Sequence, residues 1–126
     1  MVPDEKFIVF VVDDDESVLD SMKFLIESAG YHSAGFKSAE DFLDSGLGER
    51  PCCLILDIRL PGMSGFKLQE HLVKAQRGIP VIFITGHDRE RMEEEAVRLG
   101  AIAYLRKPFD EHSLLGAIQL ACERKT

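Results

Sequence analysis

The chain has 126 residues, 45% hydrophobic and 29% charged, which is enough for one domain with a buried core and too little for two. Its net charge of −7 argues against direct binding of nucleic acid, because contacts to phosphates need clustered lysines and arginines. No apolar stretch approaches the ~18 residues of a membrane span, and residues 1–5 lack the features of a signal peptide, so we expect a cytoplasmic protein without membrane contacts.

Four apolar segments without polar alternation predict strands buried on both faces, as in a parallel sheet covered by helices, and one weaker run with small and polar residues predicts a fifth strand. They are residues 7–12, 31–36, 52–57, 80–84 and 101–105, of which the second is weaker and suits a sheet edge. Helical periodicity predicts helices over 16–29, from Ser38 to Gly46, from Ser64 to Gly78, over 88–99, and from about Asp110 onward. The alternation predicts an α/β, doubly wound (βα)5 sandwich with a five-stranded parallel sheet and right-handed crossovers.

The helices carry start signals and apolar faces of their own. Ser38 and Ser64 are the expected N-caps, because a serine hydroxyl can accept a hydrogen bond from the first turn. The expected buried positions of the helix after Ser64 are Phe66, Leu68, Leu72 and Val73. The helix over 88–99 has few apolar positions, so it is either an ordinary solvated helix or a movable element beside a site.

The three cysteines are Cys52, Cys53 and Cys122. Their odd number, the adjacency of the first two and the lack of a C-x-x-C spacing argue against a metal site and against a disulfide framework. We expect all three to be reduced, small residues of the core.

Polar side chains follow four of the five predicted strands. In chain order they are Asp13, Asp14 and Asp15, then Asp57, then Thr85, then Lys107. Because the carboxyl ends of parallel strands meet at one edge of a sheet, these groups are expected to converge on a ligand-binding crevice. For Asp57 alone, a solvated carboxylate opening the loop 58–62 is an equally good interpretation.

Converging carboxylates at Asp13, Asp14 and Asp57 would repel one another, so at neutral pH they need a cation or a bound proton. A set of oxygen ligands without histidine or cysteine favours Mg²⁺ or Mn²⁺ over zinc or copper. Thr85 offers a hydroxyl donor and Lys107 a mobile positive charge, both suited to phosphoryl oxygens. A carboxylate is ionised at neutral pH and can act as the nucleophile without a base, so the sequence predicts phosphoryl transfer.

Two further residues have alternative interpretations. His87 either borders the pocket, where it influences the access of water to a phosphorylated Asp57, or is a plain surface histidine. Arg59 either completes the metal site with its backbone carbonyl or is a solvated arginine.

The chain resembles, over its whole length, the CheY-like receiver domains of two-component response regulators, which have a flavodoxin-like fold. The matching features are Asp13-Asp14 after an apolar strand, Leu-Asp-Ile-Arg-Leu-Pro-Gly-Met-Ser-Gly around Asp57, Ile-Thr-Gly-His at 84–87 and Lys-Pro-Phe at 107–109. Residues 11–18, 38–43 and 80–87 further resemble the FixJ-like group of transcriptional regulators. Together and in the right order these motifs make the match specific, although each alone is weak.

The resemblance implies a role for each site residue. Asp57 would take a phosphoryl group from a sensor histidine kinase; Asp14, Asp57 and the Arg59 carbonyl would bind Mg²⁺, for which Mn²⁺ can substitute, and Asp13 would act through water. Thr85 and Lys107 would hold the phosphoryl oxygens, and the Lys107-Pro108 bond would be cis. Thr85 and Tyr104 would form the switch that changes the surface of the fourth helix, fifth strand and fifth helix. Such a domain catalyses only its own Mg²⁺-dependent transfer and slow dephosphorylation.

The resemblance also bears on partners and extent. We expect residues 1–126 to form a single receiver domain that pairs with a kinase and forms a phosphorylation-dependent homodimer. Members of the FixJ-like group carry a helix-turn-helix domain after the receiver, so we expect an excised part of a longer regulator, with a stand-alone receiver as the alternative; DNA would be bound only through that further domain. A haloacid-dehalogenase-type phosphatase is disfavoured because Arg59 stands where its second carboxylate belongs. A binding-only pseudo-receiver is disfavoured because no acidic residue, threonine or lysine of the site is missing.

Overall fold

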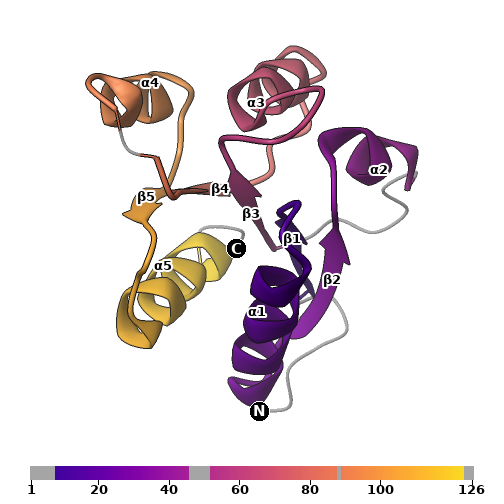
Figure 1. Ribbon diagram of the computed structural model, residues 1–126, viewed down its shortest axis with the longest axis vertical. Helices are drawn as coiled ribbons and strands as arrows, with labels where there is room; N and C mark the ends of the chain where they lie inside the picture. Colours follow the sequence, from indigo (N-terminus) through magenta and orange to yellow (C-terminus); the bar gives the residue numbers. More distant parts are fainter. Residues whose placement is uncertain (1–7, 46–51, 88, 124–126) are drawn as a thin grey trace.

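The structure, a computed structural model, describes residues 8–45, 52–87 and 89–123. Its strands form one parallel sheet in the order β2-β1-β3-β4-β5 (Figure 1). The strands are β1 (Ile8–Val12), β2 (His32–Phe36), β3 (Cys53–Asp57), β4 (Val81–Thr85) and β5 (Ala103–Arg106). The predicted doubly wound sandwich is therefore confirmed, and so is the edge position of the weak second strand.

Helices cover both faces of the sheet. They are α1 (Glu16–Ser28), α2 (Ala39–Asp44), α3 (Gly65–Lys74), α4 (Met92–Arg98) and α5 (Glu111–Glu123). Figure 1 shows α1 and α5 on one face of the sheet and α2, α3 and α4 on the other. No helix among the described residues is long and apolar enough to cross a bilayer.

Two apolar clusters, one on each face, hold the layers together because side chains of a strand alternate between its faces. On the face of α1 and α5, Val9, Val11 and Ile55 pack with Ile26 and Ile118. On the other face, the alternate residues of the same strands pack against α2, α3 and α4. The fully buried members of this second cluster include Val12, Leu54 and Leu56 of the strands and Phe42 and Leu68 of the helices. All five residues of β3 are buried, so its last residue, Asp57, is fixed from both sides.

The local start signals identify two helices correctly. The Ser38 hydroxyl accepts a hydrogen bond from the Asp41 amide at 3.0 Å, and the Ser64 hydroxyl accepts one from the Lys67 amide at 3.1 Å. The first helix has a cap that we did not predict, because Asp15 accepts from the Ser17 amide at 3.0 Å.

Two predictions about helices are wrong in part. Val73 is 55% exposed, because the buried positions of α3 follow the spacing of Gly65, Leu68, Gln69 and Leu72, and Val73 lies beyond the edge of that stripe. Helix α4 begins at Met92, later than predicted; the predicted start, Asp88, lies outside the described residues. Arg91, just before α4, has a left-handed backbone with φ of 71°.

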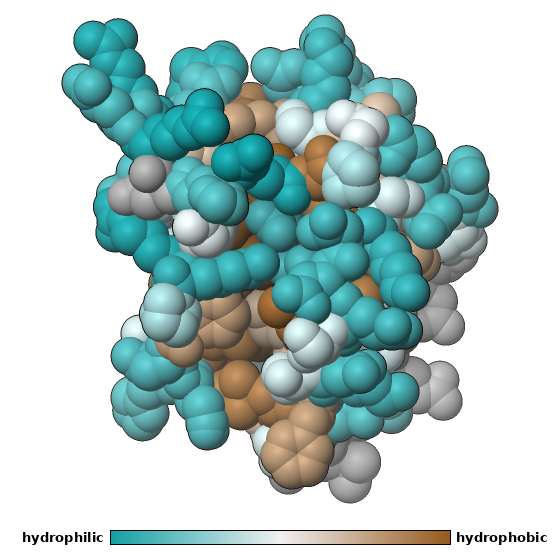
Figure 2. All heavy atoms as spheres, viewed as in Figure 1, coloured by the Kyte–Doolittle hydropathy of each residue, from teal (hydrophilic) through white to brown (hydrophobic). Residues whose placement is uncertain are grey.

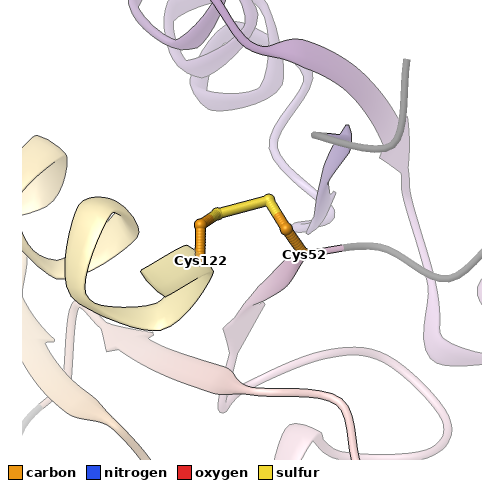
Figure 3. Close-up of a disulfide and its surroundings, with 2 residues drawn as sticks. All are labelled: Cys52 and Cys122. Carbon is orange, nitrogen blue, oxygen red and sulfur yellow. A yellow bond between two sulfur atoms is a disulfide. The ribbon is translucent and has the colours of Figure 1, made fainter. Parts of the chain in front are cut away.

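The prediction that all three cysteines are reduced is also wrong. Cys52 and Cys122 form a disulfide, with their Cα atoms 4.9 Å apart (Figure 3). Cys52 directly precedes β3 and Cys122 lies near the end of α5, and both belong to the same apolar cluster. Seventy residues separate them in sequence, so only the packing of α5 against the sheet brings them together.

Candidate functional site

The polar residues that follow the strands meet at one edge of the sheet. Asp13 follows β1, Asp57 ends the neighbouring strand β3, Thr85 ends β4, and Lys107 follows β5. The order β1-β3-β4-β5 places these four positions side by side, as the parallel arrangement predicts. The expected convergence of sequence-distant groups is therefore present.

Lys107 links the two buried carboxylates. Its Nζ lies 2.8 Å from Oδ2 of Asp13 and 3.2 Å from Oδ2 of Asp57. The backbone of Lys107 is fixed as well, because its N–H donates to the Thr85 carbonyl at 2.7 Å. The Lys107-Pro108 peptide bond is cis, as the resemblance implied.

The second oxygen of each buried carboxylate accepts from the backbone. Oδ1 of Asp13 accepts from the Asp15 N–H at 2.9 Å, and Oδ1 of Asp57 accepts from the Arg59 N–H at 3.2 Å. Asp13 is completely buried and Asp57 is 5% exposed, whereas Asp14 is exposed. Each buried carboxylate thus has one oxygen on a backbone amide and the other on Lys107.

The site holds more negative charge than its lysine can balance. Oxygens of Asp13, Asp14 and Asp57 lie within 4.8 Å of one another, so with Lys107 the cluster carries a net charge of −2. Burial raises the pKa of Asp57, the Asp13 charge raises it further, and Lys107 offsets only part of this. Burial by itself would lower the pKa of Lys107, but its hydrogen bond to Asp13 and the charges of both partners outweigh burial and raise it.

The three carboxylates form a group that could hold a metal ion. All available donors are hard carboxylate oxygens, the kind that Mg²⁺ prefers, and a divalent cation would bring the net charge of the cluster to zero. The residues present therefore fit a hard divalent ion.

A cleft of about 790 Å³ opens over these carboxylates. Its walls include the loop after β3, with Arg59, and the exposed His87 after β4. His87 therefore lies at the rim, and its influence on the access of water to a phosphorylated Asp57 stays a prediction. Arg59 is exposed beside the cleft, and its backbone N–H is the group that donates to Asp57.

Of the two residues expected to form a switch, Thr85 lies at the site, and Tyr104 lies beside Phe83 on the neighbouring strand. Thr85 is 1% exposed, and its Oγ1 accepts from the His87 N–H at 3.1 Å. Tyr104 on β5 is half-buried against the cluster that α3 and α4 cover, and the Arg106 guanidinium lies 5.4 Å from its ring centroid.

Sequence reasoning missed two residues that shape the loop after β3. Gly65 lies against the strand end, because a Cβ there would lie 2.3 Å from the Asp57 carbonyl oxygen. Glu40 accepts a hydrogen bond from the Met63 N–H at 3.0 Å. The sequence signal for Gly65 was its place directly after a capping serine; for Glu40 no local signal exists.

Comparisons with known proteins agree with this geometry. A family model described as the response regulator receiver domain matches residues 9–119. The chain is 43% identical over 119 residues to the response regulator protein TmoT of Ectopseudomonas mendocina, covering 94% of this chain and 54% of TmoT. It is 36% identical over 113 residues to the transcriptional regulatory protein FixJ of Bradyrhizobium diazoefficiens, covering 90% of this chain and 55% of FixJ. The solved structure of the response regulator StyR matches with a TM-score of 0.83 and 46% identity, covering 94% of this chain and 62% of that one. The chain thus spans about half the length of the curated relatives it matches.

Proposed function

The chain belongs to the family of response regulator receiver domains of two-component systems, and on this premise we propose that Asp57 is the residue that accepts the phosphoryl group. The observation that carries the proposal is the contact of Lys107 with both Asp57 and Asp13, which places a cation over the carboxylate at the end of the central strand. The cleft above Asp57 gives a phosphoryl donor access to it.

We assign the metal to Asp14, Asp57 and the backbone carbonyl of Arg59, with Asp13 acting through water. The different roles of Asp13 and Asp14 are supported by their burial. Asp13 is completely buried and forms an ion pair with Lys107, whereas Asp14 is exposed to solvent. We propose Mg²⁺, with Mn²⁺ as a substitute, because the donors are hard oxygens. When bound, the metal would neutralise charge on the phosphoryl oxygens.

In the proposed transfer, an Asp57 oxygen attacks the phosphorus of a phosphohistidine on a sensor kinase. The new P–O bond forms as the P–N bond breaks, and the electron pair of that bond stays on the imidazole nitrogen. Lys107 is within reach of Asp57 and can hold a phosphoryl oxygen. Thr85 can do so once its hydroxyl turns from the His87 amide and donates to the phosphoryl group. These groups support this chain's own transfer and slow dephosphorylation.

We propose that the phosphoryl group shifts a two-state equilibrium through Thr85 and Tyr104. A full reversal of such an equilibrium needs about 5.5 kcal/mol. A few charge-assisted hydrogen bonds of about 1.5–3 kcal/mol each from Thr85 and Lys107 could supply it. Movement of Thr85 would vacate space for Tyr104 and alter the α4-β5-α5 surface, where Val97 is 68% and Leu120 49% exposed. We further propose phosphorylation-dependent self-association through this surface, and sedimentation that finds the same monomer with and without phosphorylation would reject it.

A groove beside the cleft supports docking of the kinase. It is lined by Val18, Phe24 and Leu25 of α1 and by Phe109, and Gly86 and Lys107 line both the groove and the cleft. Phe24 is 78% exposed. Figure 2 shows a mostly polar face on which apolar side chains gather between the positions of α1 and α5. We assign the groove to the part of the sensor kinase that surrounds its phosphohistidine, so Phe24→Ala should slow transfer from a kinase and leave transfer from acetyl phosphate unchanged.

The process that this domain controls is also a proposal, because the chain spans about half the length of its curated relatives. We propose that residues 1–126 act as one receiver domain that controls transcription in the cytoplasm through a DNA-binding part outside this chain. The description of FixJ as a transcriptional regulatory protein supports this.

Incubation with acetyl phosphate and Mg²⁺ tests the proposal. Intact mass spectrometry should show one adduct of ~80 Da that is stable in acid and released by hydroxylamine, as an acyl phosphate is. EDTA should prevent its formation. An adduct of the same yield in Asp57→Asn would refute the assignment, and a wild-type protein that forms none would favour a binding-only pseudo-receiver.

A further inference from the structure

The loop from Ile58 to Ser64 forms one wall of the cleft and leads directly from Asp57 to α3. Its start is fixed by a contact with β3, and its end is fixed by a contact with Ile58, the residue directly after β3. At the start, the Arg59 N–H donates to Asp57 Oδ1, and at the end the Gly65 N–H donates to the Ile58 carbonyl at 2.9 Å. These contacts leave the middle of the loop to be held by another element.

Glu40 of α2 contacts that middle part. Its Oε2 accepts from the Met63 N–H at 3.0 Å across 23 residues of sequence. Gly62 makes the approach possible, because a Cβ at position 62 would lie only 2.8 Å from the same oxygen. Gly62 also has φ of 76°, a left-handed backbone that glycine adopts without a steric cost. The carboxylate of Glu40 and the glycine next to Met63 therefore fit each other.

Helix α2 is a firm base for this contact. Its first residue, Ala39, and the aromatic Phe42 are completely buried. The Phe42 ring packs edge-on against Phe10 of β1 and Phe36 of β2, at centroid distances of 5.8 and 5.5 Å. The backbone of Glu40 is therefore tied to the core of the sheet, while its side chain reaches out to the loop.

We propose that Glu40 is a positioning residue for the phosphoryl-transfer site. Its carboxylate holds Gly62 and Met63, and through them the loop that carries Arg59, whose backbone carbonyl is assigned to the metal. A hydrogen bond from a backbone amide to a carboxylate is charge-assisted and stronger than a neutral one. Glu40 acts only through the loop, and the inference rests on the function proposed above.

The test compares three variants of the same helix. Glu40→Ala removes the acceptor at an exposed position, so the packing of α2 stays intact. Glu40→Gln keeps a carbonyl oxygen that can accept from Met63 but removes the charge. Asp41→Ala is the matched control, because it removes the neighbouring exposed carboxylate from the same turn.

Two measurements are made without phosphorylation, both by ¹H–¹⁵N NMR. Hydrogen exchange of the Met63 amide should be at least about tenfold faster in Glu40→Ala, faster by a smaller factor in Glu40→Gln, whose neutral hydrogen bond is weaker, and near the wild-type rate in Asp41→Ala. A Mg²⁺ titration should give a Kd raised about tenfold in Glu40→Ala, as for other residues that orient metal ligands, and changed less than about twofold in the other two.

Each contrary outcome overturns the inference. An unchanged Met63 exchange rate or Mg²⁺ affinity in Glu40→Ala excludes positioning by this bond. A Kd raised equally in Glu40→Gln and Glu40→Ala assigns the effect to charge instead. The two proposals can fail separately. If the wild type forms the phosphoryl adduct but Glu40→Ala has unchanged Met63 exchange and Mg²⁺ affinity, only this inference is removed. If Glu40→Ala weakens Mg²⁺ binding but the wild type forms no adduct, only the proposed function is removed.

Discussion

Replacing Asp57 by asparagine should make the metal-free protein more stable, although it removes the residue on which the proposed chemistry depends. Asp57 is buried beside Asp13 and within 4.8 Å of Asp14, and it shares one lysine with Asp13. Asparagine has nearly the same shape and lacks the charge. It can still accept a hydrogen bond from Lys107.

The distances give the size of the effect. At an effective dielectric constant of 20, two charges 4.8 Å apart, which is the upper limit for the oxygens of this cluster, repel by about 3.5 kcal/mol, and we apply this value to Asp13 and to Asp14. The attraction of Asp57 to Lys107 at 3.2 Å is about 5 kcal/mol, so repulsion exceeds attraction by about 2 kcal/mol. Burial of the charge adds to this cost, whereas solvent around Asp14 and the lost bond from the Arg59 amide reduce it. We expect a net gain of about 1–2 kcal/mol in the free energy of unfolding, equal to about 3–8 °C in Tm.

The pH dependence follows from the raised pKa of Asp57. A carboxyl group whose folded pKa is above its unfolded value of 3.8 binds its proton more tightly in the folded state. Its contribution to stability is therefore fully present below 3.8 and is lost as the pH rises through the folded pKa. The gain from Asp57→Asn should be present at neutral pH and shrink as the pH falls toward 3.8.

Urea unfolding followed by far-UV circular dichroism, in EDTA at neutral and mildly acidic pH, measures this difference. Asp41→Asn, which removes an exposed carboxylate from α2, is the control and should give no gain. Saturating Mg²⁺ should stabilise the wild type more than Asp57→Asn and so reduce the difference in their free energies of unfolding. An Asp57→Asn protein that is no more stable than the wild type at neutral pH without metal would refute the reasoning.

Other perturbations of the site and the disulfide have equally definite outcomes. Mg²⁺ at 100 times its Kd should raise the free energy of unfolding of the wild type by about 2.7 kcal/mol in urea titrations, and Asp14→Asn should lose most of this gain; equal gains would remove Asp14 from the metal site. Lys107→Met should destabilise the metal-free protein by about 3 kcal/mol, because it leaves two buried carboxylates without their cation, and the loss should diminish in acid as Asp57, whose pKa is raised, protonates; a loss that stays constant with pH would contradict this. Reduction with dithiothreitol should lower stability by about 2–4 kcal/mol, because the Cys52–Cys122 disulfide closes a loop of about 70 residues; Cys122→Ser should not respond to the reductant, and a wild type that does not respond either would count against the pairing.

The fold and the edge of the sheet that carries the site were predictable because they depend on local pattern and general topology. Unbroken apolar runs identified the strands, and the parallel arrangement alone requires that Asp13, Asp57, Thr85 and Lys107 meet. The capping serines were readable for the same reason, since a cap involves residues only three apart in sequence.

Contacts between distant segments were not predictable in this way. The pairing of Cys52 with Cys122 depends on how far α5 extends along the sheet, and the bond from Met63 to Glu40 depends on how α2 is oriented. The sharing of Lys107 between two carboxylates is a matter of side-chain geometry that no periodicity encodes. Val73 was misjudged because it is apolar, although the helical stripe of α3 leaves it in solvent.

The most direct test of the central claim is to locate the phosphoryl group on the chain. After treatment with acetyl phosphate and Mg²⁺, sodium borohydride reduces an aspartyl phosphate to homoserine, and tandem mass spectrometry of the digested protein identifies the converted position. We expect homoserine at position 57 alone. Homoserine at Asp13 or Asp14, with Asp57 unmodified, would contradict it.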